Sequence, residues 1–217
     1  SKPEADLAKR LYGLKKTHAE VLGAGVTTEF TYDADRFREK FGIKEKFLLY
    51  AGRKDVGKNI YTLLSYFQKY REQHKESDMK LVLIGGGEVN VPKEIQDEVI
   101  DLGYVDLQDK YDAYAAAEML CQPSHNESFS IVIMESWLCR RPVLVSDYCA
   151  VTKNFAKESN GGLYFKTYYE FEAEVDYILN HPEEAKIMGE NGREYVLKNF
   201  SWDVFVKKFL NFFETMK

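Results

Sequence analysis

The sequence is short of cysteine, of long apolar runs and of surplus basic residues, and each shortage excludes a class of protein. The three cysteines form no C-x-x-C pair, which favours reduced thiols over a disulfide framework. The apolar runs, such as 129–134, are far shorter than the ~20 residues that span a bilayer. The net charge of −5 argues against a nucleic-acid partner, because binding a phosphate backbone needs a concentrated basic surface. From the thiols of Cys121, Cys139 and Cys149 we expect a cytoplasmic protein.

The rest of the composition is that of an ordinary globular protein. Of the 217 residues, 45% are hydrophobic and 30% are charged, which suits one α/β domain with a sizeable core and a helical tail. The chain opens on Ser1 without a start methionine, and residues 1–18 are polar and charged. We therefore expect 1–18 to be a linker or a helix taken from a longer protein.

Short apolar runs alternate with amphipathic stretches through the middle of the chain. Strands are expected at the apolar runs 20–22, 47–51, 81–85, 103–105, 119–121, 143–146 and 163–165. Helices are expected at 59–73, 92–101, 107–117, 129–139 and 152–158. This pattern is typical of a doubly wound parallel sheet with helices on both faces, and we assign 19–167 to such an α/β domain. Ligands of such a sheet bind beyond the carboxyl ends of its strands.

Residues 168–217 have an all-helical pattern. His181-Pro182 interrupts it, and Ser201 is suited to cap a final helix. That helix carries one apolar stripe, formed by Trp202, Phe205, Val206, Phe209, Phe212 and Phe213. We expect the stripe to pack on its own domain or on a domain outside this chain. A helix lying on a membrane surface is the alternative.

A phosphate-binding loop is predicted after strand 47–51, where the sequence runs Gly52-Arg53-Lys54-Asp55-Val56-Gly57-Lys58-Asn59. It nearly matches the G-x-x-x-x-G-K-[ST] loop of ATP-binding proteins, but Asn59 stands where a hydroxyl ligates magnesium. In a second interpretation Arg53 and Lys58 bind a diphosphate, the arginine as a fork and the lysine as a point charge. An exposed basic loop is the third interpretation.

The segment Pro123–Glu135 is the strongest indication of a site. Glu127 and Glu135 are separated by seven residues, and a helix is expected to begin near Phe129. The free N–H groups of residues 129–132, aided by the helix dipole, would attract an anion. A diphosphate bound there would lie between two carboxylates, one accepting hydrogen bonds from sugar hydroxyls and the other from ribose hydroxyls.

Other candidate site residues are set aside. His125 is interpreted as a polar loop residue, because no nucleophile is paired with it. The remaining histidines have no metal-ligand spacing, so no metal site is predicted. The run Gly85-Gly86-Gly87 lacks the third glycine of G-x-G-x-x-G, which argues against a nicotinamide or flavin site and leaves a tight turn.

Taken in order, these motifs resemble the C-terminal, donor-binding domain of the family 4 retaining glycosyltransferases, whose GT-B architecture has two facing Rossmann-like domains. The elements that carry the resemblance are Gly52-Arg53 with Lys58, Ile84-Gly85-Gly86-Gly87, Pro123-Ser124, the E-x7-E pair Glu127 and Glu135, and Arg141-Pro142-Val143. The resemblance implies retaining transfer of a hexosyl group from a nucleotide-diphosphate sugar to the hydroxyl of a carbohydrate or lipid-linked acceptor. It implies neither a metal nor a cofactor beyond this co-substrate.

The resemblance also implies an N-terminal domain that this chain lacks, joined at residues 21–26. The 217 residues alone are therefore expected to be inactive. The absent domain would carry the acceptor site and would hold the enzyme at the cytoplasmic face of a membrane. The C-terminal helices 168–217 would pack on the donor-binding domain and towards the absent one.

Single residues receive roles from the same resemblance. Arg53 and Lys58 would bind the donor diphosphate, and Glu127 would lie beside the transferred sugar. Glu135 would hold the ribose. The other expected donor-binding residues are Gly52, Gly85, Gly86, Tyr104, Val105, Lys110, Ser128, Phe129, Ser130, Ile131 and Val132. Three of these, Tyr104, Val105 and Lys110, match the stretch that lines the base pocket.

The sequence departs from the family pattern at a few positions. Ser128 and Ser130 replace the glycines of the usual E-G-F-G, and because serine is small and can donate a hydrogen bond, the phosphate site is expected to survive. Arg141 replaces the usual glycine before Pro-Val, with an effect that the sequence does not predict. Two other functions stay open, a P-loop-like ATP-binding domain and a non-catalytic nucleotide-binding module.

Overall fold

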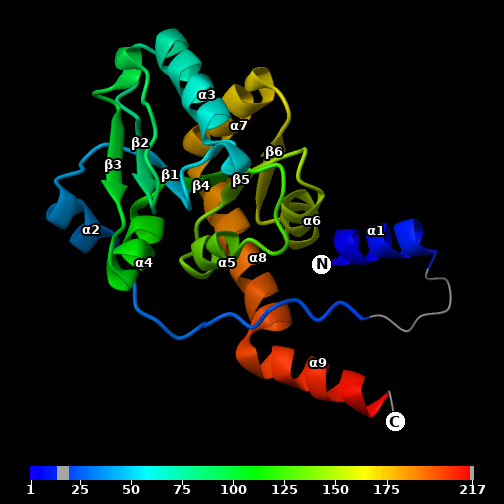
Figure 1. The fold of residues 1–217 in the computed structure, drawn as a ribbon. Coiled ribbons are helices and arrows are strands. Elements are labelled where there is room, and N and C mark those ends of the chain that lie inside the picture. The colour runs from blue at the N-terminus through cyan, green and yellow to red at the C-terminus, as the bar shows by residue number, and fades with distance from the viewer. Residues whose placement is uncertain (14–19, 216–217) are drawn as a thin grey trace.

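A parallel sheet forms the centre of the molecule (Figure 1). The computed structural model describes residues 1–13 and 20–215. The six strands are β1 (Phe47–Ala51), β2 (Lys80–Ile84), β3 (Val99–Gly103), β4 (Met119–Gln122), β5 (Val143–Ser146) and β6 (Gly162–Phe165). Their order is β3-β2-β1-β4-β5-β6, all parallel, which confirms the doubly wound, Rossmann-like α/β fold. The order reverses between β1 and β4, so the crevice at their carboxyl ends is the expected place for a ligand.

Helices cover both faces of the sheet. The helices of the described chain are α1 (Lys2–Tyr12), α2 (Ala34–Phe41), α3 (Ile60–Gln73), α4 (Leu107–Ala116), α5 (Ile131–Leu138), α6 (Ala150–Ser159), α7 (Tyr168–Asn180), α8 (Pro182–Phe200) and α9 (Trp202–Glu214), of which α1, α2 and α9 pack on other helices. Two short 3-10 helices, η1 (Val56–Lys58) and η2 (Lys93–Ile95), lie in loops. The segment 1–12 is therefore a helix, whereas residues 14–18 of the expected linker lie outside the described residues.

Alternate residues of the strands divide the core into two clusters. On β1, Leu48 and Tyr50 face α3 and α7, while Phe47 and Leu49 face α4, α5 and α8. All four side chains are fully buried, as a strand covered on both faces requires. Trp137 of α5, also fully buried, donates its indole N–H to Gly161 O at 2.7 Å. These contacts fix α5 against the sheet.

Three expected elements are wrong. The helix expected at 92–101 is instead η2 followed by β3, whose residues Val99 and Ile100 pair with β2. The observed strand β3 ends at Gly103, the residue at which the expected strand 103–105 begins. β3 is an edge strand with an exposed Asp101, so its pattern lacks the continuous apolar run that marks the other strands. Residues 20–22 form no strand in the described chain; the segment joins the fold through a bridge from Val26 to Ser201.

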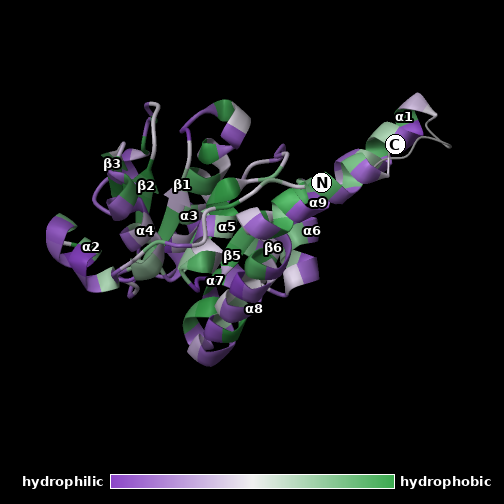
Figure 2. Ribbon diagram, turned by 90° about the horizontal axis from the view of Figure 1, so that it is seen from below, coloured by the Kyte–Doolittle hydropathy of each residue, from purple (hydrophilic) through white to green (hydrophobic). Residues whose placement is uncertain are grey.

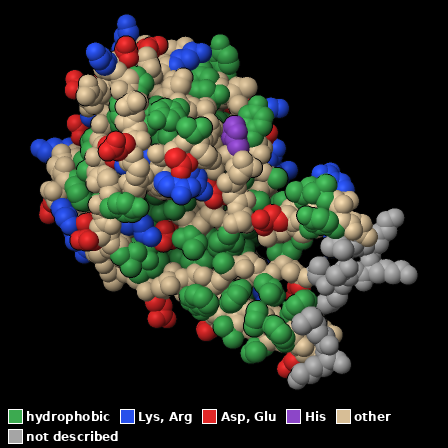
Figure 3. Space-filling view, viewed as in Figure 1, with side chains coloured by type: hydrophobic (Ala, Val, Ile, Leu, Met, Phe, Trp, Pro, Cys, Tyr) green, Lys and Arg blue, Asp and Glu red, His purple; other side chains and the backbone are tan. Residues whose placement is uncertain are grey.

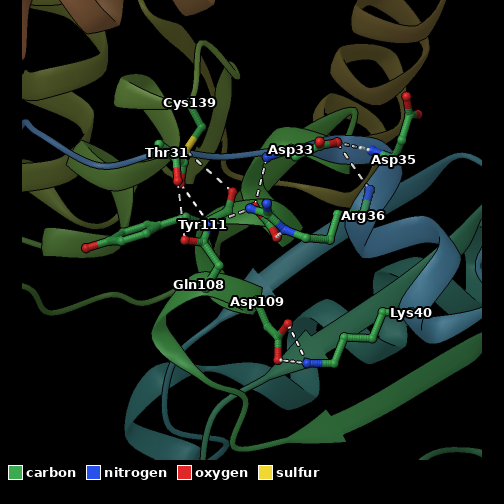
Figure 4. A network of polar contacts seen from close by, with 10 residues as sticks. Thr31, Asp33, Asp35, Arg36, Lys40, Gln108, Asp109, Tyr111 and Cys139 are labelled. Carbon is green, nitrogen blue, oxygen red and sulfur yellow. Dashed lines mark hydrogen bonds and ion pairs between the residues drawn. The ribbon is translucent and has the colours of Figure 1, made fainter.

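Helix α2, which the sequence analysis did not anticipate, is held on α4 by charged side chains (Figure 4). Asp112 of α4 is fully buried and accepts hydrogen bonds from Arg36 Nη2 at 2.7 Å and from the amide of Asp33 at 2.8 Å. Lys40 reaches Asp109 with an Nζ–Oδ2 distance of 2.7 Å. Burial alone would raise the pKa of Asp112, but these hydrogen bonds outweigh it and lower that pKa below its usual value.

The helical tail begins by packing on the domain and ends in a helix that is only partly covered. α7 lies beside α3, and α8 crosses α5 (Figure 1). In the described chain no residue of α9 is buried, and Trp202 and Phe213 are 53% and 48% exposed. The ribbon of α9 carries hydrophobic residues, coloured green in Figure 2, and apolar side chains gather at the place of α9 in Figure 3. The expected stripe therefore exists but is only partly covered by its own domain. None of the described helices combines the length and the apolar character that crossing a bilayer requires.

We predict that Asp112→Ala lowers the free energy of unfolding by about 2 kcal/mol, because the substitution removes a buried carboxylate and leaves its hydrogen-bond donors without an acceptor. The native pKa of Asp112 is lowered, so its contribution is present above pH ~4 and is lost as the pH falls through the lowered value. Urea unfolding at pH 7 and at pH 3 measures both effects. Asp35→Ala, which removes an exposed carboxylate from the neighbouring helix α2, is the control. Equal losses in the two variants would contradict the prediction.

Candidate functional site

A cleft of 570 Å³ lies at the carboxyl ends of β4 and β5. Its wall is formed by Lys58 of η1, by the loop that contains His125 and Glu127, and by Tyr148 before α6. Helix α1 closes one side through Leu7. The cleft thus opens at the ligand-binding edge expected for this fold.

The loops after β1 and β2 touch through glycines. Gly85 has φ 119°, a conformation that side chains disfavour, and a Cβ at this position would lie 2.2 Å from Gly52 O. The amide of Gly52 donates to Ile84 O at 2.9 Å, and that of Gly85 donates to Gly103 O at 2.7 Å. A Cβ at Gly86 would meet the ring of Tyr104. These glycines are required because three strand ends approach one another closely.

Lys54 also ties these strand ends together, and the sequence analysis missed it. The residue is 4% exposed, and its Nζ donates to Gly85 O at 2.8 Å and to Asp101 Oδ1 at 2.6 Å. A lysine between Arg53 and Asp55 suggests a solvent-exposed loop, so its burial could be expected only from the place of Asp101 on the edge strand.

Lys58 and Glu127 form the central contact of the cleft. Lys58 Nζ lies 2.7 Å from Glu127 Oε1, and their side chains are 28% and 9% exposed. The loops that carry them are joined by Asn59, which has φ 58°. Its side-chain amide lies 3.1 Å from Pro123 O and 3.0 Å from His125 Nε2. The cation expected at a diphosphate and the carboxylate expected at a sugar therefore meet each other.

Arg53 lies apart from this pair. Its side chain is 72% exposed and forms an ion pair with Asp55 in the same loop. Its backbone carbonyl accepts a hydrogen bond from the hydroxyl of Tyr50 at 2.6 Å. The structure therefore brings Lys58, and not Arg53, into contact with Glu127.

Helix α5 begins two residues later than expected, at Ile131 rather than near Phe129. Ser130 precedes it in the left-handed conformation, with φ 62°. The first amides without a partner in the helix are thus those of Ile131 and Val132, while Ile133 N donates to Ser130 O at 3.1 Å. The ring of Phe129 packs in the core against Phe155 and Phe200. The turn expected to bind an anion is displaced along the chain, but Ser128 still lines the cleft.

Glu135 lies in the body of α5, 6% exposed. Lys110 Nζ lies 2.6 Å from its Oε1, and the hydroxyl of Tyr114 donates to Oε2 at 2.9 Å. Burial, reinforced by the charge of Glu135, raises the pKa of Tyr114 well above its ordinary value, so this phenol stays protonated. Of the residues expected at the base pocket, Lys110 thus contacts Glu135, Tyr104 is 88% exposed, and Val105 packs at the edge of the core.

The remaining departure from the family pattern, Arg141, is explained by packing. Arg141 Nε donates to Ala115 O at 2.9 Å, so the arginine binds the carboxyl end of α4. A cation is stabilised there by the negative end of the helix dipole. Among the described residues, no group of three His, Cys, Asp or Glu side chains is arranged to hold a metal ion. The three cysteines are free and buried.

We predict that Ser130→Gly stabilises the protein by about 1 kcal/mol, because glycine adopts φ 62° without the strain of a side chain. It also removes a buried hydroxyl that has no hydrogen-bond partner among the described residues. Chemical denaturation measures the effect. Ser136→Gly, the same substitution inside α5, is expected to destabilise by about 0.5 kcal/mol or more. A destabilised Ser130→Gly variant would show that the serine is required at this turn.

Comparison with known proteins identifies a family. The sequence profile described as Glycosyl transferases group 1 matches residues 32–195. An uncharacterised glycosyltransferase of Methanocaldococcus jannaschii is 28% identical over 188 residues, which cover 82% of this chain and 47% of that protein. The chain thus spans about half the length of this curated relative.

Solved structures share the fold over nearly the whole chain. A sucrose-phosphate synthase from Thermosynechococcus elongatus has a TM-score of 0.80 at 22% identity, covering 99% of this chain and 56% of that chain. The HepE protein of Anabaena, in complex with UDP-glucose, has a TM-score of 0.73 at 17% identity, covering 89% of this chain and 56% of that chain. Because the profile matches residues 32–195, most of the chain, this chain belongs to the glycosyl transferases group 1 family.

Proposed function

We propose that this chain is the donor-binding half of a retaining, metal-independent glycosyltransferase that uses a nucleotide-diphosphate sugar. The observation that carries the proposal is the Lys58–Glu127 ion pair at the switch point of the sheet, with Glu127 four residues before α5 begins. A cation that can bind phosphate then lies beside a carboxylate that can bind sugar hydroxyls. In such a donor the distal phosphate is likewise bonded directly to the sugar.

The diphosphate would bind at the amides of Ile131 and Val132, where the positive end of the helix dipole stabilises an anion. Lys58 would leave Glu127 and pair with the diphosphate, whose two phosphates together carry two negative charges in place of the single charge of Glu127. Glu127, released from Lys58, would accept hydrogen bonds from the hydroxyls of the sugar and orient it. Glu135 would accept hydrogen bonds from the ribose.

In the transfer step, the bond between the anomeric carbon and the distal phosphate oxygen breaks, and its electron pair leaves with the nucleoside diphosphate. The acceptor oxygen forms a bond to the same carbon, on the face from which the phosphate departed, and the acceptor proton passes to the departing phosphate oxygen. Lys58 and the α5 amides would stabilise the charge that develops on the leaving group, the role that a metal ion fills in other transferases.

The whole enzyme would contain a second α/β half that binds the carbohydrate or lipid-linked acceptor. Two observations support this proposal: the chain covers 47% of its M. jannaschii relative, and the apolar stripe of α9 is only partly covered by the domain that carries it. We place residues 19–167 in the donor-binding domain, with the helices of 168–217 reaching towards the other half. The buried free thiols suit a reducing compartment, and we propose a cytoplasmic enzyme held at a membrane face by that half.

A P-loop-like ATPase is the weaker alternative. Asn59 stands at the position that would need a magnesium-binding hydroxyl, and its side chain joins the loops after β1 and β4. Lys58 lies against a carboxylate.

We predict that a nucleoside diphosphate binds without magnesium and that Lys58→Met weakens its affinity about tenfold or more, the loss expected for a charge-assisted hydrogen bond. Glu127→Gln, by contrast, is expected to bind the bare diphosphate at least as tightly as the wild type, because Lys58 loses its competing partner. Calorimetry with UDP, GDP and ADP, with and without magnesium, measures these affinities.

Lys80→Met is the matched control for that series, since this lysine lies at the amino end of β2, away from the cleft, and should leave binding unchanged. Strictly magnesium-dependent binding of a triphosphate would favour the ATPase. If UDP, GDP and ADP all fail to bind, the proposal is wrong and a non-catalytic module remains.

A further inference from the structure

Both oxygens of Glu135 are bonded to side chains of one helix, α4. Lys110 Nζ lies 2.6 Å from Oε1, and the Tyr114 hydroxyl lies 2.9 Å from Oε2. Lys110 and Tyr114 are one helical turn apart, so both face α5. A carboxylate at 6% exposure is costly to ionise without such partners, and here it has a cation and a hydroxyl donor.

We propose that Lys110 and Tyr114 are positioning residues, which hold the Glu135 carboxylate ionised and in one orientation and thereby make the site prefer ribonucleotides to 2′-deoxyribonucleotides. This inference rests on the proposed function, in which Glu135 accepts hydrogen bonds from the ribose of the donor. It assigns Lys110 to the sugar of the nucleoside rather than to the base.

The hydrogen-bonding capacity of Glu135 allows this role. A carboxylate has about four acceptor positions, and the two side chains of α4 occupy two of them, so two remain for a vicinal diol. Tyr114 is completely buried, which fixes Oε2. The side chain of Lys110 is 27% exposed and so lies between the carboxylate and solvent. Glu135 therefore loses its rotamer freedom when the protein folds and not when the nucleotide binds, which favours affinity.

A purely structural role is the competing explanation, in which the contact only joins α4 to α5. The same helix supplies a comparison, because Asp109 of α4 pairs with Lys40 of α2 (Figure 4). That pair joins two helices and lies outside the residues assigned to donor binding. Removing a structural contact should lower the affinity for all nucleotides alike. Removing a positioning contact should lower only the part of the affinity that the ribose 2′-hydroxyl contributes.

The experiment compares Lys110→Met, Tyr114→Phe and the control Lys40→Met in the 217-residue chain. Calorimetry gives the dissociation constants for UDP, GDP and ADP and for their 2′-deoxy counterparts, and thermal unfolding checks each variant. The wild type should prefer the ribose form of its tightest nucleotide about tenfold or more. Tyr114→Phe and Lys110→Met should lower this ratio below about threefold while the affinity for the 2′-deoxy form changes little, because the diphosphate contacts remain. Lys40→Met should keep the wild-type ratio.

The outcomes separate this inference from the function on which it rests. If no diphosphate binds the wild type, both are wrong. If diphosphates bind but the ribose and 2′-deoxy forms bind equally, or if the ratio survives in Tyr114→Phe, only the positioning role is overturned. Tyr114→Phe removes a single oxygen atom, so it keeps the test valid if Lys110→Met does not fold.

Discussion

The ion pair between Lys58 and Glu127 is the contact on which the account of this site depends. It joins the loop after β1 to the loop after β4, the two strands between which the order of the sheet reverses. Asn59 supports it by bonding to the same second loop. Because Glu127 is 9% exposed, a nearby cation stabilises its charge. In the proposed binding mode a diphosphate draws that cation away, and the hydroxyls of the donor sugar would then replace it at the carboxylate. Phosphate binding would thereby favour sugar binding.

The second carboxylate of the site, Glu135, is also paired with a lysine. Glu135 is held by Lys110 and Tyr114, so each glutamate of the E-x7-E pair has its own lysine. The start of α5 lies between them in the sequence, with Ser130 in a conformation that usually belongs to glycine. Strain and paired charges are therefore concentrated where the ligand is expected, while Trp137 and the strands beneath are packed without exposed surface.

The sequence predicted the interior strands of this fold well and one of its two edge strands poorly. The runs at β1, β2, β4 and β5 were recognised because strands covered on both faces are continuously apolar. The edge strand β6 was recognised from its own apolar run, 163–165. The strand β3 was missed because it lies at the edge of the sheet and carries the exposed Asp101. Helix α2 was missed because its place depends on Asp112, seventy-six residues beyond Arg36.

The residue types of the site were predictable, but their partners were not. Lys58, Glu127 and Glu135 were named from motifs, and the first two meet, yet nothing in the spacing pairs Lys110 with Glu135. Lys54 was missed because a buried lysine needs the distant Asp101. The left-handed conformation of Ser130 was missed because in a sequence that conformation is usually indicated by a glycine.

The most direct measurement is a crystal structure of the 217-residue chain with a bound nucleoside diphosphate. The account predicts the distal phosphate within hydrogen-bond distance of the amides of Ile131 and Val132, with Lys58 Nζ moved from Glu127 to a phosphate oxygen. A diphosphate bound elsewhere on the molecule, with the Lys58–Glu127 contact intact, would contradict it.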